Sequence, residues 1–286
     1  METINVIFLG SSQLLYNCAR KTRNYYEQNV NIKVIDTSDS ATQKKKKLQD
    51  EFGNTKEYST KSELFDYLEH IDEHTFLFSI NNPYILPKRV CSNQNLTMIN
   101  LHHALLPRHP GRNAEAWTIY EQDLWGGISW HFLNQKIDSG DIICQRKINI
   151  TENTTSLKLL RLCEREALDS FDIFLPMSGI ADMPKTKQSG KMETPKKASD
   201  IPNGGLLNLN WPIDKSLAFL NSLNYAGIDV MGFPKVEYQD TNFTIKSYQI
   251  VTKNQDFCKK ILYNSEVNTL EIHDRQKYLI LNLEQS

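Results

Sequence analysis

Two polar residues, Asn100 and His102, stand two positions apart at the end of an apolar run that is expected to form a buried strand. Because side chains alternate between the faces of a strand, both point to the same side, while Leu101 between them points into the core. The side-chain amide of Asn100 can donate a hydrogen bond to a developing oxyanion. The imidazole of His102 can donate to that oxyanion or accept a proton. A pair of this kind is commonly a structural feature, so the rest of the sequence decides its meaning.

A carboxylate follows about three dozen residues after His102. Asp138 begins the loop sequence Asp-Ser-Gly, which lies between two expected strands. A carboxylate beside an imidazole orients the ring and stabilises its cation, most strongly away from bulk water. We therefore expect Asp138 to be shielded and close to His102. An oxyanion donor, a proton acceptor and an orienting carboxylate together suit acyl transfer to a neutral amine, a reaction that requires no metal.

Two segments carry these residues in a distinctive order. Residues 100–107 are Asn-Leu-His-His-Ala-Leu-Leu-Pro, and residues 126–141 contain Gly-Gly-Ile-Ser and then Asp-Ser-Gly-Asp. This order resembles the 10-formyltetrahydrofolate-dependent formyltransferase family, whose motif is Asn-x-His, Leu-Leu-Pro, a Gly-Val-Thr-like strand and an Asp-x-Gly loop. The resemblance is nearest to the N-formyltransferases of small-molecule amines such as sugars and amino acids. It covers the chain well to about Ala181 and the remainder loosely.

The resemblance implies a role for each matching residue. Asn100, His102 and Asp138 take the catalytic positions, and 10-formyltetrahydrofolate is the formyl donor. His131 and Arg112 are expected to bind the acceptor, although a structural histidine and a solvated loop arginine are compatible with the same sequence.

A further set of residues is implied to contact the folate. In this set, Ala104 stands where the family usually has serine. The four Leu and Ile side chains of the set can equally be ordinary core residues. The set comprises Ile85, Leu86, Ala104, Leu105, Leu106, Pro107 and Asp141.

The charge of the chain bears on the amine that receives the formyl group. The 33 basic and 34 acidic residues leave a net charge of −1, which argues against nucleic acid as a partner. We therefore predict formyl transfer to the primary amine of a small molecule, either an amino sugar nucleotide or an amino-acid-derived amine. A methionyl-tRNA formyltransferase is the alternative within the family. A formyltetrahydrofolate hydrolase and a non-catalytic folate-binding module are the alternatives outside amine transfer.

The hydrophobic pattern predicts an open α/β fold with a mostly parallel sheet and a Rossmann-like N-terminal half. Residues 1–180 form the expected catalytic domain, residues 181–205 a linker rich in Pro and Lys, and residues 206–286 a small β-rich domain. Strands are expected over 4–9, 31–35, 75–80, 96–101, 127–133, 141–150, 235–239, 243–251, 268–273 and 277–283. Helices are expected after residue 12, over 62–69 and 114–122, after Thr155, and over 214–223.

The remaining composition points to an ordinary cytoplasmic protein. The five cysteines are scattered and include no C-x-x-C pair, which predicts reduced thiols and no metal site. No run approaches the roughly 20 apolar residues of a membrane helix, and the N-terminus lacks the features of a secretion signal. The oligomeric state stays open, with a homodimer as one option.

Overall fold

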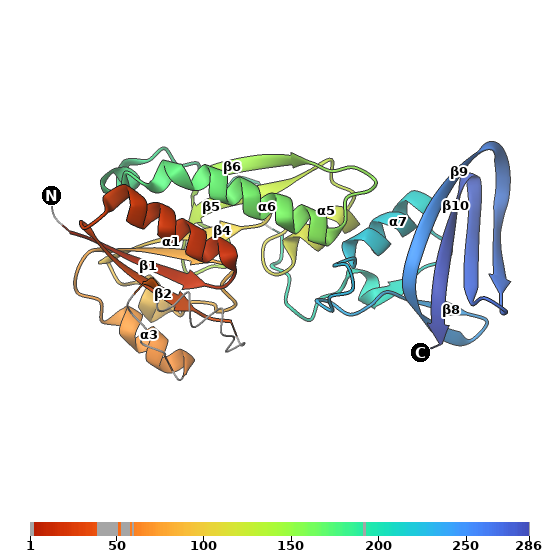
Figure 1. The fold of residues 1–286 in the computed structure, drawn as a ribbon, viewed down its shortest axis with the longest axis horizontal. Helices are drawn as coiled ribbons and strands as arrows, with labels where there is room; N and C mark the ends of the chain where they lie inside the picture. Colours follow the sequence, from red (N-terminus) through yellow and green to blue (C-terminus); the bar gives the residue numbers. More distant parts are fainter. Residues whose placement is uncertain (1–2, 39–50, 53–57, 59, 191–192, 286) are drawn as a thin grey trace. The chain divides into compact units, whose positions relative to one another are not determined.

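A computed structural model describes residues 3–38, 51–52, 58, 60–190 and 193–285 of the chain. A six-stranded sheet has the order β2-β1-β3-β4-β5-β6 (Figure 1). The pairs β1–β2, β1–β3 and β3–β4 are parallel, and β4–β5 is antiparallel. This arrangement confirms the predicted open, mostly parallel sheet. The strands are β1 (Ile4–Gly10), β2 (Val30–Asp36), β3 (Thr75–Ile80), β4 (Leu96–His102), β5 (Trp125–Phe132) and β6 (Ile142–Asn149).

Apart from the short helix over Lys88–Cys91, which was not predicted, the helices of this part lie where the apolar periodicity predicts them. The apolar face expected after residue 12 is buried in α1, at Leu14, Leu15, Cys18 and Ala19. The Lys158 amide donates to Thr155 Oγ1 at 3.3 Å, as expected of an N-cap. The helix expected over 114–122 ends at Tyr120. The helices are α1 (Gln13–Tyr26), α3 (Lys61–Glu69), α4 (Lys88–Cys91), α5 (Ala114–Tyr120) and α6 (Ser156–Ser170), followed by the 3-10 turns Phe171–Phe174 and Met177–Asp182.

Aromatic side chains fill the core beside β1, β3 and β5. The ring of Phe78 lies 5.1 Å from that of Phe171 and 5.6 Å from that of Phe174, in the edge-to-face arrangement that aromatic quadrupoles favour. Trp130 is fully buried, and its indole N–H donates to Ser170 Oγ at 3.0 Å. The strands are therefore held by large buried side chains, and their carboxyl ends provide a rigid base for polar residues.

The chain divides into two compact units. The first comprises residues 1–111, 127–147 and 163–195, and the second comprises residues 112–126, 148–162 and 196–286. The second unit thus draws on two segments that precede residue 180. The division into a domain over 1–180, a linker over 181–205 and a domain over 206–286 stays a prediction.

The second unit contains a four-stranded sheet of order β10-β9-β8-β7. Its two long strands form an antiparallel hairpin, whose core side is closed by buried residues such as Phe219 and Leu281. The sequence prediction of short strands over 243–251, 268–273 and 277–283 is wrong in extent, because the ladder continues through polar stretches and through register shifts near Arg275. The elements are a 3-10 turn (Pro202–Gly205), β7 (Leu206–Leu207), α7 (Ile213–Ser222), β8 (Lys235–Tyr238), β9 (Thr241–Asn264) and β10 (Thr269–Gln285).

Candidate active site

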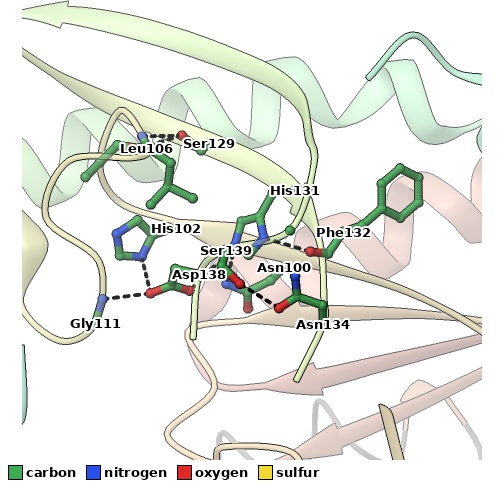
Figure 2. A network of polar contacts seen from close by, with 12 residues as sticks. Asn100, His102, Leu106, Gly111, Ser129, His131, Phe132, Asn134, Asp138 and Ser139 are labelled. Atoms are coloured by element: carbon green, nitrogen blue, oxygen red, sulfur yellow. Dashed lines mark hydrogen bonds and ion pairs between the residues drawn. The ribbon is translucent and has the colours of Figure 1, made fainter. Parts of the chain in front are cut away.

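Polar side chains gather where β4 and β5 pair at the end of β4. In the antiparallel register, Asn100 is opposite His131 and His102 is opposite Ser129. Directly opposed residues project from the same face of a sheet, so these four side chains lie on one side. Figure 2 shows Asn100, His102 and His131 grouped around Asp138. The strand pairing thus brings a second histidine next to the predicted pair.

The ring of His131 is held in one tautomer. Its Nδ1 lies 2.9 Å from the backbone carbonyl of Phe132, which can only accept, so Nδ1 carries the hydrogen. Nε2 then accepts a hydrogen bond of 3.2 Å from Nδ2 of Asn100. One of the two amide hydrogens of Asn100 is therefore committed to His131, and the other remains for a further acceptor.

His102 is buried, and both of its ring nitrogens face oxygen atoms. Nε2 donates to the backbone carbonyl of His109 at 2.8 Å. Nδ1 lies 3.5 Å from Oδ2 of Asp138, and the side chain of His102 is 7% exposed. The carbonyl partner places the hydrogen of neutral His102 on Nε2, which leaves the lone pair of Nδ1 facing the carboxylate.

Asp138 lies between the two imidazoles and is 11% exposed at its side chain. Its Oδ2 accepts a hydrogen bond of 2.7 Å from the backbone amide of Gly111. Its Oδ1 lies 3.6 Å from Nε2 of His131. The expectation that Asp138 is shielded and close to His102 is confirmed.

The electrostatics of the site favour an ionised carboxylate beside a neutral imidazole. Burial lowers the pKa of His102 below its ordinary value and outweighs the opposing effect of the Asp138 charge. Burial alone would raise the pKa of Asp138, but the positive charge that His102 carries when it is protonated, the His131 contact and the Gly111 amide together hold that pKa well below its usual range. Asp138 therefore keeps its charge at neutral pH, and His102 has an unprotonated nitrogen.

The loop that carries Asp138 has a tightly defined course. A Cβ at Gly140 would lie 1.7 Å from the carbonyl oxygen of Phe132, so only glycine fits there. Asp138 itself has a positive φ of 48°, which aspartate tolerates better than most residues. Ser139 Oγ donates to Asn134 Oδ1 at 2.8 Å within the loop (Figure 2). These constraints explain the Asp-Ser-Gly sequence.

The Ala-Leu-Leu-Pro segment is anchored by Ser129, the residue opposite His102. Ser129 Oγ donates to the Ala104 carbonyl at 2.7 Å and accepts from the Leu106 amide at 3.0 Å. Gln145 Nε2 donates to the same hydroxyl at 2.8 Å and to the Leu106 carbonyl at 2.9 Å. Ala104 and Leu106 are buried, so their side chains belong to the core on this side.

The other residues expected at the folate differ in exposure. Ile85 is 70% exposed and available to a ligand, whereas Leu86 packs in the core and is 7% exposed. Leu105 and Pro107 are half-buried. Asp141 is also half-buried, and its carbonyl accepts from the Phe132 amide at 3.0 Å. Their folate contacts stay a prediction.

The two residues expected at the acceptor lie in different units. His131 is buried to 1% exposure and contacts Asn100 and Asp138. Arg112 belongs to the second unit, where its backbone amide donates to the Lys196 carbonyl at 2.9 Å. Contact of either side chain with an acceptor stays a prediction.

Three groups that sequence reasoning did not assign to the site also take part in it. They are the backbone carbonyl of His109, the backbone amide of Gly111 and the hydroxyl of Ser129. Backbone groups carry no residue-type signal, so motif comparison could not find the first two. Ser129 could have been found, because it stands two positions before His131 in an expected strand and therefore lies on the same face as that histidine.

The described residues include neither a candidate metal site nor a membrane-spanning helix. Among them, no group of three or more His, Cys, Asp or Glu side chains could hold a metal ion. No helix within the same ranges is sufficiently long and apolar to span a bilayer.

The fold and the site together define a class of protein. An open α/β sheet carries an amide and two imidazoles on adjoining strands, and a shielded carboxylate lies beside them. These groups can transfer protons and stabilise an oxyanion. Comparison with known families agrees: the model of the formyl transferase family matches residues 4–167. The chain belongs to the formyl transferase family.

Curated relatives are about a quarter identical to this chain over the aligned regions. The GDP-perosamine N-formyltransferase of Brucella melitensis is 27% identical over 150 residues, which cover 52% of this chain and 56% of the relative. The methionyl-tRNA formyltransferase of Fusobacterium nucleatum is 27% identical over 168 residues, which cover 54% of this chain and 53% of the relative. The match thus spans about half the length of these relatives.

Solved structures share the fold over the whole chain. WlaRD, a sugar 3N-formyl transferase solved in the presence of dTDP and 5-N-formyl-THF, has a TM-score of 0.76 at 15% identity and covers 100% of both chains. The N-formyltransferase from Helicobacter canadensis, in complex with folinic acid and dTDP-3-aminofucose, has a TM-score of 0.74 at 14% identity and covers 99% of this chain and 100% of that one. At these identities the likeness concerns the fold.

Proposed function

We propose that this protein transfers a formyl group from 10-formyltetrahydrofolate to the primary amine of a nucleotide-linked amino sugar. The observation that carries the proposal is the grouping of Asn100, His102 and His131 around the buried carboxylate of Asp138. Membership of the formyl transferase family supports the reaction.

We infer one step for each side chain from the geometry. The second amide hydrogen of Asn100, which His131 does not use, donates to the oxyanion that develops when the amine attacks the formyl carbon. Nδ1 of His102 accepts the proton that the amine loses, because Nε2 is bound to the His109 carbonyl. Asp138 stabilises the resulting imidazolium from 3.5 Å away. His102 then returns this proton to the departing folate nitrogen.

An open depression beside the Asp138 loop presents polar side chains to which the pterin part of the donor can bind. It has a volume of about 540 Å³, and its walls offer amide and hydroxyl groups to the hydrogen-bonding edge of a heteroaromatic ring. The folate supplies the formyl group when it is bound there. The lining residues are Cys91, Leu133, Asn134, Gln135, Lys136 and Ser139.

A sugar amine is the acceptor that the observations favour. Curated relatives include GDP-perosamine N-formyltransferases, and sugar N-formyltransferases share the fold over the full chain. A net charge of −1 offers little attraction to the tRNA backbone. Methionyl-tRNA formyltransferases match at the same identity, so tRNA belongs in the test.

The decisive experiment offers 10-formyltetrahydrofolate together with one acceptor at a time. The acceptors are dTDP- and GDP-linked amino sugars, an ornithine-like amine and methionine-charged tRNA. Release of tetrahydrofolate and the mass of the formylated product are measured. We expect turnover with an amino sugar nucleotide, and a loss of about a hundredfold or more in His102→Ala. The Asp182→Asn variant, which alters an exposed carboxylate of the same unit, should retain wild-type turnover.

Any of three other results would overturn the proposal. Turnover on tRNA or on the ornithine-like amine alone assigns a different acceptor. Tetrahydrofolate release at the same rate without any acceptor indicates a hydrolase. Folate binding without turnover, unchanged in His102→Ala, indicates a binding module.

A further inference from the structure

The segment that follows residue 182 passes beside the loop of Asp138. Gln188 on this segment donates from Nε2 to the Asp138 carbonyl at 2.7 Å and to the Gly140 carbonyl at 2.8 Å. We propose that Gln188 is a positioning residue of the active site, which holds the Asp138 carboxylate at the correct place for His102. The proposal rests on the proposed function and names a residue that neither the sequence motifs nor the site geometry above include.

The chemistry of the contact defines the orientation of the amide. Both neighbours are backbone carbonyl oxygens and can only accept, so the NH₂ group of Gln188 must face them. Both of its hydrogens are then used, one on each side of Ser139. The Oε1 atom is buried and has no hydrogen-bond partner among the described residues. The side chain is therefore placed by the two bonds that it donates to the loop.

The backbone around Gln188 is itself anchored to the first unit. The amide and carbonyl of Thr186 exchange two hydrogen bonds of 2.8 Å with Ile142, the first residue of β6. Further along, Oε2 of Glu193 accepts from the His109 amide at 3.1 Å. Because Thr186 is anchored two residues before Gln188, Gln188 can act as a rigid support.

The same segment supports both partners of the His102–Asp138 pair. Gln188 binds the loop of Asp138, and Glu193 binds the turn whose His109 carbonyl accepts from His102. A displacement of the loop would move the carboxylate from its position 3.5 Å from Nδ1. Interaction of charges weakens with distance, so the imidazolium of His102 would lose stabilisation.

The groups that face His102 define whether loss of Gln188 should raise or lower the pKa of His102. Burial and the His131 and His109 rings lower the pKa of His102, whereas the Asp138 charge and the hydrogen bond to the His109 carbonyl raise it. His103 is a neighbour whose own pKa burial and His102 lower to about 4. Of these influences, loss of the Gln188 hydrogen bonds weakens only the one by which the Asp138 carboxylate raises the pKa. The pKa of His102 should therefore fall further.

The test compares two variants of similar side-chain length. Gln188→Met keeps the volume and loses both donors, and Gln188→Lys keeps a donor that can reach the carbonyls. The control Ser189→Lys places the same positive charge on the neighbouring, exposed position. Activity is followed with the amino sugar nucleotide acceptor, and His102 is titrated by NMR in protein labelled at its seven histidines, with His102→Gln to assign its signal.

We expect kcat of Gln188→Met to fall by about tenfold to a hundredfold, the cost of a small misplacement. KM for the acceptor should stay within a few-fold, and the pKa of His102 should decrease. Gln188→Lys should recover most of kcat, and Ser189→Lys should behave as wild type.

Two results would overturn the inference. One is a wild-type kcat together with an unchanged His102 pKa in Gln188→Met. The other is a loss of kcat that merely parallels a loss of folded protein by circular dichroism, with the His102 pKa unchanged. Wild-type protein without turnover would instead refute the proposed function, and the titration would still decide the role of Gln188.

Discussion

Replacing Asp138 with Asn removes the charge of the site and changes little else. The amide has the shape of the carboxylate, and its oxygen can still accept the 2.7 Å hydrogen bond from the Gly111 amide. The loop is also held by Gly140, which fits closely against Phe132. We therefore expect the Asp138→Asn variant to fold and to differ from wild type in the electrostatics around His102.

The distances in the site define the size of the effect. A unit charge 3.5 Å from Nδ1 of His102 interacts with the imidazolium by about 5 kcal/mol at an effective dielectric constant of about 20. This value is an upper bound, because the amide that replaces the carboxylate keeps part of the polarity. A loss of about 3 to 5 kcal/mol from the transition state corresponds to a decrease in kcat of about a hundredfold to a few thousandfold. The same change lowers the pKa of His102 further, since the charge that raises it is gone.

Steady-state formyl transfer and NMR titration of His102 test this prediction together. Asp182→Asn serves as the control, because it removes an exposed carboxylate of the same unit. A kcat within a few-fold of wild type would refute the assignment of Asp138. A His102 pKa that rises or stays constant in Asp138→Asn would refute the electrostatic explanation, even if activity were lost.

Three further predictions concern the framework of the site and the second unit. Gly140→Ala places a Cβ 1.7 Å from the Phe132 carbonyl oxygen, so urea unfolding should show that the free energy of unfolding falls by about 1–3 kcal/mol. The control Gly179→Ala, where a Cβ meets nothing within 4 Å, should leave the free energy of unfolding unchanged. Ser129→Ala removes the hydroxyl that holds the Leu-Leu-Pro segment, so KM for the folate should rise more than kcat falls in steady-state assays, and an unchanged KM would contradict this. Burial raises the pKa of Glu115, so its contribution favours the folded state at low pH and is lost as the pH rises through that pKa. Glu115→Gln should therefore reduce the decline in the free energy of unfolding as the pH rises above about 4, the ordinary pKa of a glutamate, and an identical decline would contradict the burial argument.

Much of the fold follows from local patterns in the sequence. Apolar runs such as Ile4–Leu9 and Thr75–Ile80 are strands, because a segment buried on both faces of a parallel sheet needs apolar side chains throughout. The prediction was wrong mainly about the length of the strands in the hairpin of the second unit. Its strands include polar positions and a register shift near Arg275. A prediction based on alternating apolar and polar residues ends a strand at such positions. Cross-strand hydrogen bonds continue through such positions because the partner strand supplies them.

The candidate site was predictable in part. Strand periodicity places Asn100 and His102 on one face, and the family motif adds Asp138. The role of His131 in orienting Asn100 needed the antiparallel register of β4 and β5. That register depends on hydrogen bonds between distant segments and has no local signature.

The order of residues along the chain states which functional groups are present and on which face of β4 Asn100 and His102 lie. How those groups are held follows from the packing of distant segments. The carbonyl of His109 holds His102, the amide of Gly111 holds Asp138, and Gln188, fifty residues along the chain, holds the Asp138 loop. This difference arises because the functional groups of a side chain depend only on its residue type, which the sequence gives directly. Position and protonation depend on backbone groups and on burial, which exist only after distant segments have packed together.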